Sequence, residues 1–293
     1  MMERRGSLSR AEADVRSRMR RGPFAAARHR LVVTCVIASV VLPSWPAAAQ
    51  SEREHFQLKL SPSYDEGDFG TSETTRTFFL PLMLRYLGEK FDVAATFFFI
   101  RLDSPGDVVI IDGVPTPSGD VARDRQVESG FGDIVLKGRY FLIDDPGLPS
   151  PVPSIVPFLK LKIPTGSERK NLSTGKTDVG FGVEWDKTLG NWIVLGDLSY
   201  TIMGDPEGVE LRNRPAASIG ASYRMSSLVT VSGLLDWRRA VVPGRDDALE
   251  LVGLVTFRIT RTLALTPNAL LGLMDGSPDW GIGIELSYRF GRW

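Results

Sequence analysis

The sequence predicts an all-β protein, a transmembrane antiparallel up-and-down β-barrel of about 12 strands that follows a cleaved signal peptide. Three observations predict this class. The carboxy-terminal strand alternates strictly between apolar and polar residues, the β-rich segments are joined by alternately long and short connections, and the amino-terminal segment has the parts of an export signal. No long segment has helical periodicity, which leaves a closed barrel as the structure able to satisfy every backbone polar group within a bilayer.

The last predicted strand, residues 280–290, alternates between large apolar or aromatic residues and glycine or polar residues. Successive side chains of a strand point to opposite faces, so one face of this strand is apolar throughout and the other is polar. Lipid outside and a polar lumen inside require that pattern. We expect Phe290 to be the last lipid-facing residue and residues 291–293 to be a short tail. The apolar face consists of Trp280, Ile282, Ile284, Leu286, Tyr288 and Phe290.

Residues 1–49 resemble a secretory signal peptide in composition and order. Arginine-rich sequence runs to Arg30, an apolar run of 12 residues spans 31–42, and small residues precede a predicted cleavage site after Ala49. A transmembrane helix needs roughly 20 apolar residues, so this run is too short to be one. We predict a signal peptide over residues 1–49 and an outer-membrane barrel over residues 50–293.

Cleavage changes the charge of the chain. The leader contains nine arginines and three acidic residues, which leaves 26 basic and 32 acidic residues in the mature protein. This acidic excess argues against nucleic acid as a partner, because phosphate binding needs surplus basic groups. The single cysteine, Cys35, is lost with the leader, so the mature chain forms no disulfide and no thiolate metal site. The basic stretch is long for a leader, and the start of translation stays open between Met1 and Met19.

Twelve β-rich segments follow the leader, and an even number returns both termini to the periplasm. The connections between them alternate: the odd-numbered ones are long and polar, and four of the five even-numbered ones are short. Short periplasmic turns and long external loops produce this alternation, whereas a soluble barrel, the alternative, would turn its apolar face inward. The segments are residues 55–63, 76–86, 91–101, 131–142, 155–163, 178–186, 191–200, 214–224, 228–238, 248–260, 263–273 and 279–290.

Three segments carry a resemblance to a known family. They are Gly130-Phe-Gly-Asp133 leading to Tyr140, Lys160-Leu-Lys-Ile-Pro-Thr-Gly166, and Gly175-Lys-Thr-Asp-Val-Gly180 followed by Gly190-Asn-Trp192 and Tyr200. In order and spacing they are similar to the MetA-pathway of phenol degradation family of outer-membrane proteins, often labelled transporters. The resemblance implies a barrel linked to uptake of small, often aromatic, compounds, and it brings no catalytic residue.

The sequence offers little for catalysis. His29 lies in the leader and His55 begins the first predicted strand, so no Ser–His or Asp–His set can form unless His55 serves alone. Paired carboxylates such as Asp144-Asp145 lie in predicted loops, where solvated turn residues are common. We therefore predict no enzyme activity and no cofactor or metal.

The predicted inward face combines charged residues with large apolar ones. A basic wall beside an acidic one has two interpretations that stay open: a transverse field that orients a polar solute, or salt bridges that fill the barrel. The apolar groups suit a narrow amphipathic passage or a largely plugged one. The charged lumen-lining candidates are Lys137, Arg139, Lys160, Lys162, Asp178, Glu184, Asp236, Arg258, Glu285 and Arg289. The apolar ones are Phe79, Phe98, Val135, Phe141, Phe158, Ile193, Leu195, Leu234 and Leu254.

The longest predicted loop, residues 102–130, contains four consecutive β-branched residues, Val108 to Ile111, followed by Asp112-Gly113. Exposure of four apolar side chains in a row to water is unfavourable. We therefore expect the loop either to form a hairpin beyond the membrane or to fold inward as a constriction.

The sequence thus predicts a passive channel of the Gram-negative outer membrane for small organic compounds, of aromatic or anionic type. Its expected partners are outer-membrane lipid, the barrel-assembly machinery and the solute. Two alternatives stay open: a barrel enzyme acting on lipid or lipopolysaccharide, and a structural barrel with a blocked lumen. The sequence does not define the solute or the oligomeric state.

Overall fold

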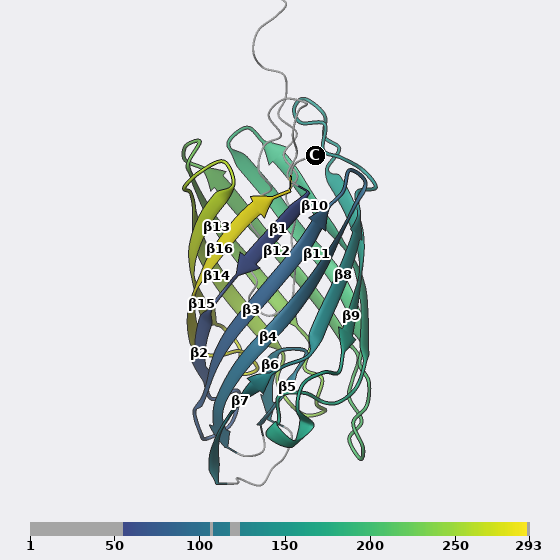
Figure 1. Cartoon of the computed structure of the whole chain (residues 1–293), viewed down its shortest axis with the longest axis vertical. Coiled ribbons are helices and arrows are strands. Elements are labelled where there is room, and N and C mark those ends of the chain that lie inside the picture. Colours follow the sequence, from purple (N-terminus) through teal and green to yellow (C-terminus); the bar gives the residue numbers. More distant parts are fainter. Residues whose placement is uncertain (1–54, 106–107, 118–123, 292–293) are drawn as a thin grey trace, which may run out of the picture.

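The computed structural model describes residues 55–105, 108–117 and 124–291. The predicted signal peptide and Trp293 lie outside the described residues. The main sheet is antiparallel and closes on itself, because β1 pairs with both β3 and β16, so that the first and last strands are neighbours (Figure 1). Among the described residues, none of the helical structure is long and apolar enough to cross a bilayer.

The sheet contains 14 strands that form the 12 staves of the barrel, where a stave is one crossing of the wall. β1 and β2 share one stave, and β7 and β8 share another. The strands are β1 (Phe56–Leu60), β2 (Ser63–Gly67), β3 (Thr75–Leu87), β4 (Phe91–Pro105), β7 (Arg125–Phe131), β8 (Ile134–Tyr140), β9 (Ser154–Ile163), β10 (Asp178–Leu189), β11 (Trp192–Ile202), β12 (Arg214–Arg224), β13 (Val229–Arg238), β14 (Ala248–Arg258), β15 (Leu263–Gly272) and β16 (Trp280–Phe290).

The prediction of a 12-stranded antiparallel barrel is confirmed, with corrections to the bounds of three strands. The first stave continues beyond residue 63 to Gly67 and is interrupted at Pro62, which has no N–H to donate to the ladder. The fourth stave begins at Arg125 instead of residue 131, and β4 extends to Pro105. The predicted loop 102–130 is therefore shorter than expected, because its two ends pair with each other as β4 and β7.

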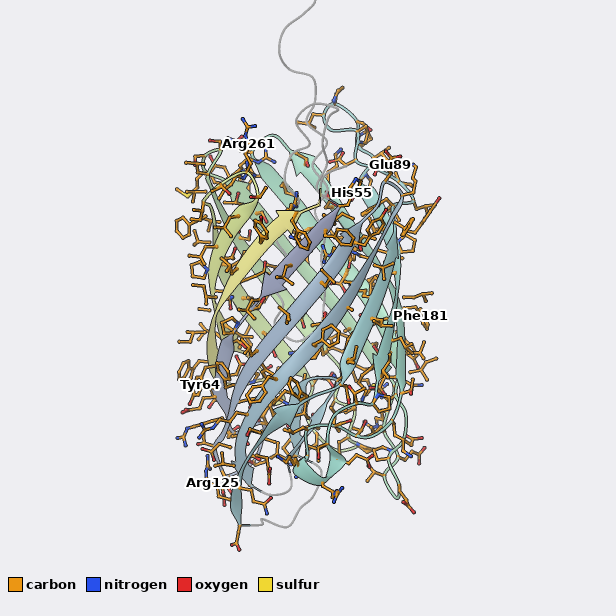
Figure 2. All side chains as sticks on the ribbon, viewed as in Figure 1. His55, Tyr64, Glu89, Arg125, Phe181 and Arg261 are labelled. Carbon is orange, nitrogen blue, oxygen red and sulfur yellow. The ribbon has the colours of Figure 1, made fainter. Side chains whose placement is uncertain are left out.

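The two ends of the barrel differ as the alternating connections predict. Figure 2 shows Glu89 and Arg261, which lie in short connections, at the end where β16 finishes, and Arg125 at the opposite end. The long connections and the 3-10 helix η1 (Glu168–Lys170) gather at that opposite end (Figure 1). We call the first end periplasmic and the second external, because short periplasmic turns and long external loops characterise these barrels.

The outer surface is an apolar belt with aromatic residues near both ends. Outward residues of β16 are largely exposed, such as Ile282 at 55 % and Leu286 at 42 %. At the periplasmic end Phe56 contacts Tyr86 and Phe290, with both pairs of ring centroids 5.6 Å apart. Aromatic rings favour the membrane interface, where one part of the ring is in apolar surroundings and the other is hydrated. This surface needs lipid around it, and it places the barrel in the bacterial outer membrane.

A second, two-stranded sheet lies inside the external mouth. It consists of β5 (Val108–Ile111) and β6 (Val114–Pro117), joined by a turn in which Asp112 and Gly113 have φ angles of 47° and 75°. Positive φ at both positions is typical of the tight turn that Asp-Gly favours. The predicted hairpin therefore forms, and it folds inward instead of extending past the membrane.

Two apolar clusters hold the hairpin across the mouth. Val108 and Ile110 pack with inward residues of β3 and β4. Ile111 packs with Met203 and Leu211 of the β11–β12 connection and with Val241 of the β13–β14 connection. The backbone N–H of Ile110 also donates to the carbonyl oxygen of Asn171, with N and O 2.8 Å apart. The hairpin thus spans the external opening from one side to the other.

Candidate functional site

The ten charged candidates all lie on the inward face, at different depths. Seven of them are buried: Lys137, Arg139, Lys160, Lys162, Asp178, Glu184 and Glu285. Three are partly exposed, namely Asp236 near the external end and Arg258 and Arg289 near the periplasmic end. The nine apolar candidates are all buried as well. Alternate residues of a strand point to the same face, so the position of each residue along its strand is sufficient to predict this orientation.

A central network joins β4, β8 and β10 through charges. Lys137 Nζ lies 2.7 Å from Glu184 Oε1, and Arg139 Nη1 lies 3.5 Å from the other oxygen of Glu184. Arg139 also holds Asp92 through two hydrogen bonds, at 2.7 Å from Nε and 2.5 Å from Nη2. All four side chains are nearly inaccessible, so each charge depends on its partner.

A second group of charges lies nearer the external end. Lys162 Nζ is 2.7 Å from Asp178 Oδ2 and 3.4 Å from Asp133 Oδ2, and it donates to the Thr174 hydroxyl at 3.0 Å. Asp178 additionally accepts the backbone N–H of Gly204 at 2.8 Å. These contacts fix the start of β10 against the external connections.

Further ion pairs lie elsewhere in the lumen. Lys59 on β1 lies 3.0 Å from Glu285 on β16. Arg238 on β13 pairs with Glu250 on β14 and lies 3.4 Å from Asp236.

The predicted basic wall is not an unopposed positive surface. Its residues are Lys137, Arg139, Lys160 and Lys162, and each has a carboxylate partner, which for Lys160 is Asp112 of the hairpin.

An apolar cluster also lies in the lumen. Inward side chains of β9, β11, β13, β14 and β15 and the start of the β8–β9 connection form this cluster, which contains Phe141, Val156, Ile193, Leu195, Leu234, Val252, Leu254 and Leu270. Phe158 lies on β9, as does Val156 of this cluster, and its ring centroid is 3.8 Å from Lys137 Nζ. A cation over an aromatic face is attracted by the ring quadrupole. The lumen is therefore amphipathic, with ion pairs beside an apolar cluster.

Gly182 makes room for the Phe158 ring. A Cβ at Gly182 would lie 2.6 Å from Phe158 Cζ, far inside van der Waals contact. Glycine at this position of β10 therefore allows the Phe158 ring to lie against the neighbouring strand.

The hairpin turn contributes a carboxylate to the external mouth. Both oxygens of Asp112 accept hydrogen bonds from Lys160 Nζ, at 3.1 and 2.9 Å, and Oδ2 lies 3.6 Å from Arg214 Nη1. Burial raises the pKa of Asp112, but the adjacent Lys160 and Arg214 outweigh it and hold that pKa below its usual value. Asp112 is therefore ionised at neutral pH.

Several of these residues were not among the predicted candidates. Asp92 lies six residues before Phe98 on the same strand, and residues an even number of positions apart share a face. The strand pattern could therefore have predicted that Asp92 points inward. Lys59 could have been found in the same way in the first strand. Arg214 could also have been found, because it begins the predicted strand 214–224 on the same face as the inward Ser218. Asp112 had no such signal, because only the inward path of the loop brings it to Arg214.

The described residues include no group of three or more His, Cys, Asp or Glu side chains placed to hold a metal ion. His55 lies at the periplasmic rim, with its ring stacked at 6.3 Å from that of Tyr86. Its position is shown in Figure 2.

A closed antiparallel barrel with an apolar outer belt and a charged lumen defines the class: this is an outer-membrane β-barrel protein. Residues 53–290 match the family described as "Putative MetA-pathway of phenol degradation", and the chain belongs to that family. The resemblance in the glycine and turn motifs is thereby confirmed. Among curated proteins, none matches the chain in sequence.

Solved structures share the architecture at low sequence identity. An outer-membrane channel from Pseudomonas putida F1 is similar with a TM-score of 0.63 and 14 % identity, over 83 % of this chain and 99 % of that one. The translocator domain of the autotransporter NalP from Neisseria meningitidis is similar with a TM-score of 0.50 and 12 % identity, over 97 % and 98 % of the two chains. At these identities the likeness establishes the fold.

Proposed function

We propose that this protein is a passive channel for small amphipathic organic compounds. The observation that carries the proposal is the mixed lumen, in which ion pairs between β4, β8 and β10 lie beside an apolar cluster that extends from β9 to β15. A solute with a polar group and an apolar body would keep both in suitable surroundings along such a passage. A large water-filled pore for sugars or ions would have little use for the apolar cluster.

Two comparisons support a transport role. The barrel shares its architecture with a protein named as an outer-membrane channel, and the family description refers to phenol degradation. We infer that the solutes include small aromatic compounds and their acids. We further propose that the protein is not an enzyme, since Lys137, Glu184, Lys162 and Asp178 of the lumen are engaged in ion pairs and His55 stacks on Tyr86 at the rim.

Two further proposals concern biogenesis. Residues 1–49 would direct export and be cleaved after Ala49, which mass spectrometry of the protein from outer membranes would test through its amino terminus. The alternating β16 would be the segment that the barrel-assembly machinery engages. Replacement of Phe290 by Asp should then reduce the amount of assembled barrel in cells more than it affects refolding in detergent.

A structural barrel with a blocked lumen is a second candidate, and one observation favours it. The β5–β6 hairpin crosses the external mouth and packs on β3 and β4 and on the β11–β12 and β13–β14 connections. If this closure were permanent, no solute would pass.

Liposome swelling would decide between the two candidates. The full-length protein would be reconstituted and challenged with uncharged aromatic compounds, aromatic acids and sugars of increasing size. Swelling with small aromatic solutes, and little with sugars, is expected for the amphipathic passage. Absence of permeation for every solute in the full-length protein, with permeation in a variant without residues 108–117, would instead establish a barrel that the hairpin blocks.

Matched variants on one strand make the test specific. Ser232 points inward, and its hydroxyl lies 2.8 Å from that of Ser222 on the neighbouring strand. Ser232→Trp should narrow the lumen and reduce swelling. Its neighbour Val231 is 38 % exposed on the lipid face, so Val231→Leu should leave swelling unchanged. Equal effects of the two variants would contradict passage through the lumen.

A further inference from the structure

The Asp112 carboxylate occupies a cationic site built by the barrel wall. Lys160 comes from β9 and Arg214 from the start of β12, and their side chains are 8 % and 7 % exposed. Two other strands, β10 and β11, separate them in the sheet. The two cations would repel each other in a buried position, and the carboxylate of the hairpin between them compensates for that repulsion.

Arg214 keeps unused binding capacity in this arrangement. Its Nε is buried and makes no hydrogen bond with the part of the chain that the structure describes. The contact of its Nη1 with Asp112, at 3.6 Å, is an ion pair that is too long for a hydrogen bond. A guanidinium presents its donors in a planar fork that fits a carboxylate with two hydrogen bonds, and here that fork is only partly used.

A small cavity of about 40 Å³ opens beside Arg214, between β6 and the β13–β14 connection. It has room for about three water molecules. Three further arginines, Arg238, Arg239 and Arg245, line it together with one carboxylate, Asp246, so positive charge predominates. The cavity also has apolar lining, which comes from Val114, Pro115, Pro117, Val241, Val242 and Ala248.

We propose that Lys160 and Arg214 form a binding site for a small amphipathic carboxylate, an aromatic or short aliphatic acid, and that Asp112 is the tethered occupant that this ligand displaces. The proposal rests on the channel function and names the solute class for it. The carboxylate of the solute would take the place of the Asp112 carboxylate, and its apolar body would lie on the lining of the cavity.

Displacement follows from both charge and size. A carboxylic acid and Asp112 compete for the same two cations, so binding of one excludes the other. The cavity is also too small for an aromatic acid unless the hairpin moves away. Ligand binding and opening of the mouth are therefore coupled, and the hairpin becomes a gate that the solute itself releases.

Binding can be measured without transport, by calorimetry on the full chain in detergent micelles with benzoate and the uncharged benzamide as probes. Benzoate should bind at least about tenfold more tightly than benzamide, the difference typical of a hydrogen-bonded charge. Asp112→Asn removes the competitor and should raise benzoate affinity about tenfold. Arg214→Gln should lower it by a similar factor.

Arg212→Gln is the matched control, because Arg212 is an exposed arginine two positions away and its change removes the same charge. Equal losses in Arg212→Gln and Arg214→Gln, or equal affinity for benzoate and benzamide, would overturn the site. If Arg214→Gln does not fold, Arg214→Lys takes its place, since lysine keeps the charge and loses the planar fork. Benzoate affinity should then fall, whereas unchanged affinity would overturn the role of the fork.

Hairpin release has its own readout. Ile111 and Val241 pack in one cluster, so Ile111→Cys with Val241→Cys, in a Cys35→Ser background, would tie the hairpin to the wall. Oxidation should abolish benzoate-dependent conductance in planar bilayers, and reduction should restore it. Equal conductance in both states of a cross-linked sample would overturn the gate.

The outcomes separate the site from the channel. Conductance in Asp112→Asn without any preference for benzoate over benzamide would leave the channel standing and remove the carboxylate site. Absence of conductance in the reduced cysteine variant and in Asp112→Asn alike would remove the channel function itself, whatever calorimetry gives for binding.

Discussion

Arg139 on β8 and Asp92 on β4 lie directly opposite each other in the barrel register and are joined by two hydrogen bonds of 2.7 and 2.5 Å. Neither side chain is more than 1 % exposed. The guanidinium and the carboxylate form a bidentate ion pair with two hydrogen bonds, which is the strongest arrangement of these two groups. Loss of one partner would leave a buried charge uncompensated.

Asp92→Ala should therefore destabilise the barrel by about 3–5 kcal/mol, the range for breaking a buried ion pair. Reversible urea unfolding in lipid bilayers or detergent would measure the change. The exposed pair of Arg76 and Glu66, with N and O 2.9 Å apart, is the control. Glu66→Ala should have little effect, because exposed ion pairs are weak. Similar losses in the two variants would mean that burial does not set the strength of these pairs.

A positive charge on the lipid face should destabilise the barrel. Leu251 and Val231 are 43 % and 38 % exposed on the outer belt. Leu251→Arg or Val231→Arg should cost about 2–4 kcal/mol near the middle of the membrane. Ser232→Arg, one position along β13 on the inward face, should cost less and act mainly on conductance. Equal unfolding free energies for Val231→Arg and Ser232→Arg would mean that the assignment of faces is wrong.

A methyl group at Gly182 should strain the wall. Its Cβ would lie 2.4 Å from the carbonyl oxygen of Leu198 and 2.6 Å from Phe158 Cζ. Gly182→Ala should cost about 1–3 kcal/mol, as other overpacked sites do. Gly138→Ala is the matched control, because its Cβ would meet no atom within 4 Å. Adding Phe158→Leu to Gly182→Ala should recover part of the lost stability, since it removes one of the two clashes. Absence of any recovery would mean that the strain comes only from the contact with the Leu198 carbonyl oxygen.

Charge selectivity should depend on the balance within each ion pair. Lys137→Gln leaves Glu184 with less compensation, so reversal potentials in single-channel recordings should shift towards cations. In the double variant Lys137→Gln/Glu184→Gln the net charge of the lumen is unchanged, and the shift should disappear. Persistence of the shift in the double variant would show that charge balance at this pair does not set selectivity.

Acid should release the hairpin through Asp112. Lys160 and Arg214, with Lys162 at longer range, favour its ionised form, while burial and the neighbouring Asp178 oppose it. The net effect is a pKa below the usual 3.8, so docking of the hairpin stabilises the closed mouth above that value and is weakened as pH falls through the lowered pKa. Single-channel conductance should be constant from neutral pH to about 4 and rise below it. In Asp112→Asn this acid-dependent rise should be absent, and an identical rise there would assign it to another group.

The sequence by itself determined the class, the number of staves and the face on which each side chain lies. Parity within a strand decides orientation, so Lys137 and Arg139 could be assigned to the lumen and Leu251 to lipid from local pattern alone. The lengths of the connections determined the two ends of the barrel, because turn length is also a local property.

Only the tertiary structure decided which charges meet. Asp92 reaches Arg139 because β4 and β8 are paired in one register, and Lys137 reaches Glu184 across β9. The interior position of Asp112, between Lys160 and Arg214, depends on the inward path of the hairpin. Such contacts join residues far apart in the chain, and their existence follows from barrel closure and loop packing, which no local periodicity encodes.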